Sequence, residues 1–343
     1  MDALRAMDDT DQTSRETNPR RLARLISALI LACIAGAGGL GIWFFSELHR
    51  PGTMQENTII LIPEGSGRVV ISAVLQKAGI PHSLWVMQVE EYRRGRAYRP
   101  KAGEFMLPRG SNLDQAMDII HEGKAIQHSF VIPEGWTSME VSTALLDDDR
   151  LSGTITPEIR EGELLPETYF FTRGTDRNVF LERVRKAREI AFAEAWADRA
   201  GDLPYASLDE AVILASIIEK ETGLAQERGK VASVFVNRLR AGMRLQSDPT
   251  VIYGLLRSGI VVERLKRSHL RDPNPWNTYM QPGLPPTPIC NPGLDSLIAA
   301  LNPETTPYFY FVADGKGGHA FARTLAEHNR NVRAWRSLNK QDE

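Results

Sequence analysis

The apolar positions of the chain begin with one uninterrupted run, LISALILACIAGAGGLGIWFF, from Leu25 to Phe45. The run carries no charge, and as a helix it would extend about 31 Å, which matches the hydrocarbon core of a bilayer. Arginines crowd the side before the run, whereas Arg50 is the only nearby Lys or Arg behind it. This asymmetry predicts a transmembrane helix over residues 25–45, with residues 1–24 as a cytoplasmic tail.

A cleaved signal peptide is the competing interpretation of this run. Signal peptides have shorter apolar regions, and small residues precede their cleavage sites. Bulky Trp43, Phe44 and Phe45 occupy that place here. We therefore expect a single-pass anchor in the inner (plasma) membrane, with the rest of the chain outside the cytoplasm, on the periplasmic or extracytoplasmic side.

Between residues 57 and 150 a local pattern repeats, as IPEGSGRVVISAVL, LPRGSNLDQAMDII and IPEGWTSMEVSTALL. Each copy has a short apolar strand ending in Pro, a Gly two residues later, a cap-like Ser or Thr, and the apolar spacing of a helix. The pattern predicts a small α+β module of strand-then-helix units. Such units occur in sugar-binding modules, and a compact spacer that holds the next domain off the membrane would explain them equally well.

A second, mainly helical region is predicted over residues 161–338. It opens with EGELLPETYFF, which predicts a short extended segment, and VFLERVRKAREIAFAEAWAD then has the spacing of an amphipathic helix. In SLDEAVILASIIEKETG, Ser207 and Glu210 form a capping box and Gly223 is the stop signal. Because its middle is almost entirely apolar, this helix is predicted to be buried at the centre of the domain. Near the end, YFYFVADGKGGHAFARTLAEHN predicts a β-hairpin followed by a helix.

Two glutamates end the central helix, in the stretch ILASIIEKET. Glu219 and Glu221 lie about 200° apart around a helix, so both cannot face one cleft. Glu221 continues the apolar stripe of Leu214 and Ile218, and burial along that stripe would raise its pKa toward neutrality, as a general acid requires. The helix macrodipole opposes a carboxylate at this end, which is a mild cost and a hint of function. The alternative is that both are solvated carboxylates of the last turn.

Two later segments provide candidate lining for such a cleft. MRLQSDPTVIYG places Gln246, Asp248 and Tyr253 in or just after a turn. DPNPWNTYMQPGLPPTPICNPG, residues 272–293, has too many prolines for a regular element and is predicted to be an ordered loop. Its Asn277 and Tyr279 suit sugar recognition, because rings offer flat apolar faces and amides offer paired hydrogen bonds. A structural wrap around the domain edge is the alternative.

Composition and charge exclude several other classes of function. A net charge of −2 gives no reason to expect nucleic acid, and the two cysteines, Cys33 and Cys290, predict no disulfide framework. The seven histidines show no HExxH or similar spacing, so we expect neither a metal nor another cofactor. GKGGH lacks the remaining residues of a phosphate-binding loop, and no G-x-S-x-G elbow is present.

Several motifs, taken together and in order, resemble one known family. ASIIEKET, ERGKVASVFVNRL, LQSDPTVIYG, NTYMQPGLPPTPICNPG and YFYFVADGKGGHAF are similar to the endolytic murein transglycosylases, the YceG-like or MltG family. The resemblance implies an α+β chain with a LysM-like module over 57–150 and a lytic-transglycosylase-type catalytic domain over 161–338. Related soluble enzymes have a small hydroxyl residue directly after the acid, and the pair Glu221–Thr222 fits. Leu165 departs from the family, where an aromatic residue is common at its position.

The resemblance implies a lyase that cleaves the β-1,4 bond between N-acetylmuramic acid and N-acetylglucosamine in nascent peptidoglycan, terminating glycan elongation. Glu221 would protonate the glycosidic oxygen and then accept the proton of the muramyl 6-hydroxyl as a 1,6-anhydro ring closes. Gln246, Asp248, Tyr253, Asn277 and Tyr279 would bind the substrate. Cell-wall synthases of the elongation or division machinery are the partners implied.

Two alternatives belong to different functional classes. A muramidase would use Glu221 together with Asp248, since ordinary glycosidases need two carboxylates. A membrane-tethered scaffold would bind peptidoglycan without cutting it. Glycan cleavage separates the scaffold from the enzymes, and the chemistry of the new ends separates the two enzymes.

Overall fold

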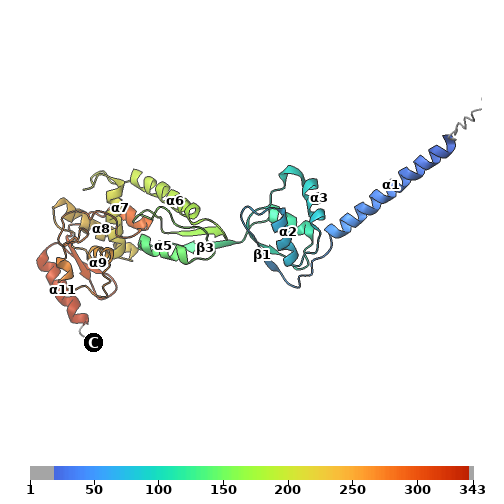
Figure 1. Cartoon of the computed structure of the whole chain (residues 1–343). Helices are drawn as coiled ribbons and strands as arrows, with labels where there is room; N and C mark the ends of the chain where they lie inside the picture. Colours follow the sequence, from blue (N-terminus) through green and yellow to red (C-terminus); the bar gives the residue numbers. More distant parts are fainter. Residues whose placement is uncertain (1–18, 340–343) are drawn as a thin grey trace, which may run out of the picture. The chain divides into compact units, whose positions relative to one another are not determined.

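The long apolar helix α1 (Pro19–Leu48) opens the part of the chain that the computed structural model describes, residues 19–339 (Figure 1). Its segment Arg20–Leu48 has a mean hydropathy of 2.2, and no part of its apolar window is buried by the protein. Length and composition fit a membrane anchor or a signal sequence near the N-terminus. Most of the predicted tail, residues 1–24, lies outside the described residues.

The chain divides into two units, and unit 1 ends at Ile126. Its strands β1 (Thr58–Ile62) and β2 (Gly103–Leu107) pair antiparallel. Three helices and one 3-10 turn complete the unit: α2 (Arg68–Lys77), α3 (Leu84–Arg94), η1 (Gly95–Ala97) and α4 (Leu113–Glu122). Leu48, the last residue of α1, is only 3% exposed and belongs to the same apolar core as Phe105 and Met117. The final turn of α1 is therefore packed into unit 1.

Unit 2 begins at Gln127, so it includes the third strand-then-helix repeat. Strand β3 (Gln127–Val131) pairs antiparallel with β4 (Thr168–Thr172), and α5 (Ser138–Asp147) follows β3. The predicted module extended to residue 150, whereas the unit boundary lies at 126/127. The reason is long-range: β3 takes its hydrogen-bond partner from the second predicted region, and local periodicity carries no information about strand partners.

The helices of unit 2 surround α7 (Leu208–Glu221), as predicted for the central helix. Seven of its residues are buried: Ala211, Val212, Leu214, Ala215, Ser216, Ile217 and Ile218. The helices packed against it are α6 (Arg177–Ala197), α8 (Ala225–Arg240), α9 (Asp248–Arg257) and α10 (Leu294–Leu301). An apolar circumference of this kind is stable only when neighbours cover every side of the helix.

The two ends of α7 differ in how closely they follow the prediction. The capping box is present, since the Ser207 side chain accepts from the Glu210 N–H and the Glu210 carboxylate accepts from the Ser207 N–H. At the other end the helix stops at Glu221, two residues before the predicted Gly223, because Thr222 adopts an extended conformation. Glu221 is thus the last helical residue.

The segments that follow α8 can be compared with their predictions one by one. Asp248 and Tyr253, predicted in or just after a turn, lie within α9, which follows the turn at residues 241–242 and begins here because Pro249 occupies its first turn, where proline favours helix initiation. Residues 272–293 contain no helix or strand, as the prolines predicted, and the 3-10 turn η2 (His269–Arg271) precedes them. The hairpin of β5 (Tyr310–Ala313) and β6 (His319–Ala322) and the final helix α11 (Leu325–Asn339) are confirmed.

Candidate active site

The two glutamates at the end of α7 bond to different parts of unit 2. Oε2 of Glu219 accepts a hydrogen bond of 2.9 Å from the N–H of Gly293, the N-cap residue of α10. Oε1 of Glu221 accepts a hydrogen bond of 2.6 Å from the hydroxyl of Ser247. The opposite orientation expected from helix geometry is therefore present. Glu219 holds α10 in place, and Glu221 faces the segment before α9.

Glu221 has an environment that keeps a proton on a carboxyl near neutral pH. Burial raises the pKa of Glu221 to about 7; the Ser247 hydrogen bond opposes this rise, and the charge of Asp248 adds to it. His319 and Arg238 lower the same pKa through their charge. Within residues 19–339, Oε2 of Glu221 accepts no hydrogen bond, so one oxygen is available for proton exchange.

Ser247 is fixed before any substrate arrives. It is 1% exposed, its N–H donates to Thr278 Oγ1 at 3.0 Å, and its carbonyl accepts from Thr250 Oγ1 at 2.6 Å. Thr250 and Thr278 also share a hydrogen bond of 2.8 Å. The first turn of α9 and the loop 272–293 thus orient the one hydroxyl that bonds to Glu221.

Arg238 of α8 connects the same segment to the C-terminal hairpin. Its buried guanidinium donates to the carbonyl oxygens of Leu245 and Phe309, each at 2.6 Å. Burial lowers the pKa of Arg238. These bonds satisfy backbone groups of the segment before α9 and of the segment before β5, and they hold a positive charge near the Glu221 carboxyl.

The structure brings Asp248 and Tyr279 together beside this carboxyl. The Tyr279 hydroxyl donates to Asp248 Oδ1 at 2.7 Å, and burial followed by this bond raises the pKa of Tyr279. Asp248 is exposed. Gln246 is also exposed and adopts a left-handed backbone conformation, with φ of 53°, which costs free energy for a residue with a side chain.

Asn277 and Tyr253 were also predicted to bind substrate, but their surroundings differ from those of Asp248 and Tyr279. Asn277 is fully buried, and its amide bonds to the carbonyl of Asp272 at 2.6 Å and to the N–H of Tyr279 at 3.0 Å. It therefore shapes the loop instead of facing a ligand. Tyr253 lies on a different side of α9 from Asp248, where its ring packs against Trp276 with centroids 5.6 Å apart.

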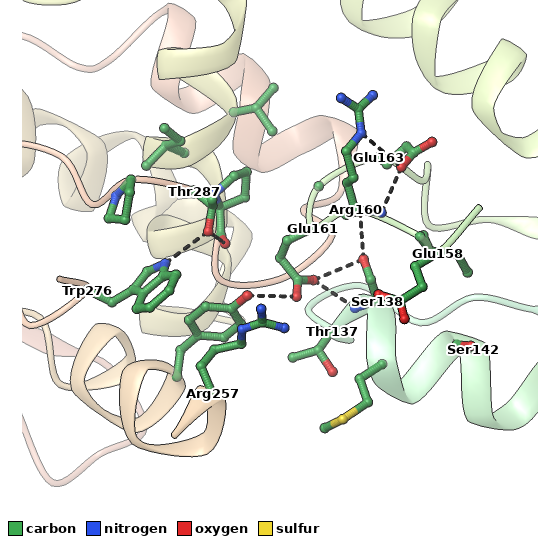
Figure 2. Close-up of a pocket in the computed structure, with 18 of the residues that line it drawn as sticks. Thr137, Ser138, Ser142, Glu158, Arg160, Glu161, Glu163, Arg257, Trp276 and Thr287 are labelled. Carbon is green, nitrogen blue, oxygen red and sulfur yellow. Dashed lines mark hydrogen bonds and ion pairs between the residues drawn. The ribbon is translucent and has the colours of Figure 1, made fainter. Parts of the chain in front are cut away.

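Tyr253 lines a cavity of about 960 Å³ that does not include Glu221 (Figure 2). The Tyr253 hydroxyl donates to Glu161 Oε2 at 3.1 Å, and Glu161 Oε1 accepts from the N–H and the hydroxyl of Ser138. Burial raises the pKa of Glu161, and these hydrogen bonds oppose the rise. Trp276 lies across the cavity with its indole N–H bonded to Thr287 at 2.9 Å. Three donors therefore hold the Glu161 carboxyl: the N–H and the hydroxyl of Ser138 and the hydroxyl of Tyr253.

Sequence analysis missed several residues of the site. Ser247 and Arg238 act through contacts between segments that are distant in sequence. His319, in the predicted hairpin, bonds through Nδ1 to Glu227 Oε2 at 2.7 Å and contributes charge near Glu221. Only the quoted motif containing GGHAF pointed to His319, and there it was interpreted as a turn. Glu161 likewise began a quoted motif without being assigned a role.

Comparison with known proteins places these residues in one family. The model of the YceG-like family matches residues 60–334. A protein of Bacillus subtilis named endolytic murein transglycosylase is 30% identical, over 85% of this chain and 89% of its own length. A protein of the same name from Streptococcus pneumoniae strain D39 is 24% identical, over 90% of this chain and 64% of its own length.

A solved structure also matches along most of its length. The crystal structure of a YceG-like protein from Listeria monocytogenes is 30% identical to this chain, with a TM-score of 0.48. The match covers 80% of this chain and 99% of that protein. On the family match over residues 60–334 and the Bacillus subtilis relative, the chain belongs to the YceG-like family.

Proposed function

We propose that this protein is an endolytic murein transglycosylase, a lyase that cuts peptidoglycan glycan strands between N-acetylmuramic acid and N-acetylglucosamine. The names of the Bacillus and Streptococcus relatives support this activity. The observation that carries the proposal is the carboxyl of Glu221, whose pKa is raised to about 7 by burial and which keeps one oxygen free of hydrogen bonds within residues 19–339. A carboxyl with this pKa can serve as an acid and then as a base near neutral pH.

In the proposed reaction Glu221 acts twice. Its proton moves to the glycosidic oxygen as the bond to the muramyl anomeric carbon breaks, which releases the N-acetylglucosamine end as an alcohol. The muramyl 6-hydroxyl then forms a bond to the anomeric carbon and gives its proton to the Glu221 carboxylate. The product is a 1,6-anhydro ring, water is not consumed, and the acid is regenerated.

The surrounding residues assist this cycle. The Ser247 hydroxyl orients the carboxyl, and its hydrogen bond stabilises the charged form between the two proton transfers. The negative charge of Asp248 works in the other direction and favours the protonated form. Opposite influences of this kind keep the pKa near the working pH, where general acid and base catalysis are most effective. Gln246 and Tyr279 are the candidates for direct contact with sugar.

The muramidase alternative assigns Asp248 to the activation of water. Asp248 already accepts a hydrogen bond of 2.7 Å from Tyr279. This bond occupies a lone pair of the carboxylate that would otherwise be open to a proton from water. The single-acid mechanism needs no such base, and we therefore prefer it.

We further propose that α1 anchors the protein in the inner membrane, with the amino terminus cytoplasmic and both units periplasmic. The exposed apolar surface of α1 supports the anchor. The arginine bias of the sequence supports the orientation. Unit 1 would then be a LysM-like module next to the membrane. Glycan strands, and the synthases that make them, would be the partners on that side.

The test is a cleavage assay with the full chain in detergent and long, uncrosslinked glycan strands. We expect mid-sized fragments to appear early, because an endolytic enzyme cuts within the strand. A ladder of disaccharides released from one end would contradict the endolytic action. Binding of strands without any cleavage would support the scaffold instead and would overturn the enzymatic proposal.

A further inference from the structure

The C-terminal end of α1 forms an aromatic contact with α3 of unit 1. The rings of Trp43 and Trp85 have centroids 5.9 Å apart, and Phe44 meets Trp85 edge to face at 6.2 Å. Leu48, one turn further along, is buried in the core of unit 1. The end of the apolar helix therefore packs directly against the module, and α3 begins at the level where the apolar run of α1 ends.

The side of α3 that continues from this contact exposes large apolar side chains. Leu84 is 40% exposed, Trp85 is 54% exposed and Tyr92 is 90% exposed. Each lies on α3 (Leu84–Arg94), and Tyr92 follows Trp85 by seven residues, which places both on one face of a helix. Tryptophan and tyrosine are enriched at the boundary between the bilayer and water, because each has an apolar ring and one polar atom.

Trp85 and Tyr92 also line a hollow of about 730 Å³, together with Arg68 and Arg96. Arg68 forms an ion pair with Glu91, so its charge is compensated. Arg96 of η1 is exposed and has no ion pair or hydrogen bond within residues 19–339. The hollow thus combines three aromatic rings, those of Trp85, Tyr92 and Tyr98, with one uncompensated guanidinium, which is suited to a phosphate group.

Other charges on α3 are neutralised within the module. Arg93 and Arg94 both bond to Glu90, which is fully buried, and Arg94 also pairs with Asp114 and Asp118 of α4. This network occupies the cations at the C-terminal end of α3. Arg96 therefore carries the available positive charge beside the aromatic rings.

We propose that Leu84, Trp85, Tyr92 and Arg96 form a membrane-docking face that lies on the bilayer crossed by α1, with Arg96 bound to an anionic lipid phosphate. This inference rests on the proposed anchoring by α1. Glycan could also stack on exposed rings, but Trp85 is held against Trp43 at the end of the apolar run, which places the face at lipid headgroups. Docking would fix the height and orientation of unit 1 above the membrane.

The test places a fluorescent probe on single cysteines of the full chain in lipid vesicles. Cys33 is replaced by Ser, and Cys290 is left in place because it is buried and its thiol pKa is raised well above the usual value. The probe is attached at Gln88→Cys, which lines the hollow, and at Lys124→Cys as the matched exposed position at the end of unit 1. Ile34→Cys in α1 reports insertion.

We expect headgroup spin-labelled lipid to quench the probe at position 88 and not at position 124, while acyl-chain spin label quenches it at position 34. Phosphatidylglycerol should strengthen the quenching at position 88 relative to phosphatidylcholine alone. Arg96→Gln should remove that added quenching, and Tyr92→Ser should weaken quenching in both lipids. Arg109→Gln, an exposed arginine on the turn after β2, is the matched control and should change neither.

Each remaining outcome rejects the proposal. Quenching at position 34 without quenching at position 88 leaves the anchor intact and shows that α3 does not dock. Absence of quenching at both positions removes the anchor and the docking face together. If added glycan strands shield position 88 from aqueous iodide while spin-labelled lipid does not quench it, the face binds glycan and not the bilayer.

Discussion

Glu221 and Glu161 are two half-buried carboxyls of unit 2 whose pKa values are both raised by desolvation, yet their surroundings differ. Glu161 lines the cavity of about 960 Å³ and accepts three hydrogen bonds, two from Ser138 and one from Tyr253. Glu221 lies outside that cavity and, among residues 19–339, accepts one hydrogen bond, from Ser247. The cavity of about 960 Å³ is thus lined by the acid whose hydrogen bonds the protein already supplies.

The difference indicates how a structural acid is distinguished from a reactive one. A carboxyl with several donors connects the elements that supply them to its own segment, here α5 and α9 to the segment before β4, and a proton transfer would disturb those bonds. A carboxyl with one donor and one free oxygen can exchange a proton with a ligand at little structural cost. The number of fixed donors, more than the size of the adjacent cavity, separates the two roles.

Glutamine substitution at the two positions should separate activity from stability. Glu221→Gln removes the proton donor and should lower the cleavage rate by about 10³-fold with the fold unchanged. Glu161→Gln should reduce the free energy of unfolding by about 1–3 kcal/mol, because an NH2 group replaces one of the two oxygens that accept from Ser138 and Tyr253 and leaves a donor unpaired, while the cleavage rate per folded molecule stays within a few-fold. Cleavage assays and thermal unfolding of both variants provide the measurement. The reverse assignment of losses would contradict the comparison.

The pH dependence of cleavage should follow the pKa of Glu221. Because the acid must be protonated, the rate should fall as pH rises through about 7. Ser247→Ala removes a bond that lowers this pKa, so the alkaline limb should move to higher pH. Asp248→Asn removes a charge that raises it, so that limb should move to lower pH.

The pair of variants also tests the muramidase alternative. Asp248→Asn should keep substantial cleavage activity at pH values below the alkaline limb of its pH–rate profile. Loss of cleavage at every pH would show that Asp248 is an essential base, and the single-acid mechanism would be wrong.

Stability should depend on pH at Glu221 in the direction set by its raised pKa. The unfolded value is about 4.3 and the folded value about 7, so folding favours the protonated form and the wild-type chain loses stability as pH rises between them. Glu221→Gln carries no such penalty and should be more stable than wild type above pH 7, by at most about 4 kcal/mol. That advantage should shrink toward pH 4. A stability difference that is flat with pH would place this carboxyl in solvent.

The smallest expected effect belongs to Glu219. Glu219→Gln weakens the bond to the N–H of Gly293 at the start of α10, and should cost about 1 kcal/mol of stability. Cleavage should remain within a few-fold of wild type, because this carboxyl faces away from Ser247. Strong loss of cleavage without loss of stability would show that the helix-face assignment is inverted.

Sequence periodicity predicted the elements well where local rules decide them. The capping box of Ser207 and Glu210, the apolar circumference of α7 and the proline-rich loop were all apparent from short stretches. The opposite orientation of Glu219 and Glu221 follows from helix geometry alone. These features depend on residues within a few positions of one another.

Contacts between distant segments could not be predicted in this way. The unit boundary at residue 126 depends on the pairing of β3 with β4. The bond from Ser247 to Glu221, the burial of Asn277 and the placement of Tyr253 opposite Glu161 depend on how α7, α9 and the loop 272–293 meet. No periodicity within one segment contains that information.

The ends of the cleaved strands test the central claim most directly. Mass spectrometry of a complete digest of uncrosslinked glycan separates 1,6-anhydro ends from reducing ends, which differ by one water. If Glu221 is the lone acid and base, new muramyl ends should be 1,6-anhydro and should be absent with Glu221→Gln. Reducing ends made by the wild-type protein would show that water attacks the anomeric carbon, which would contradict the single-acid mechanism.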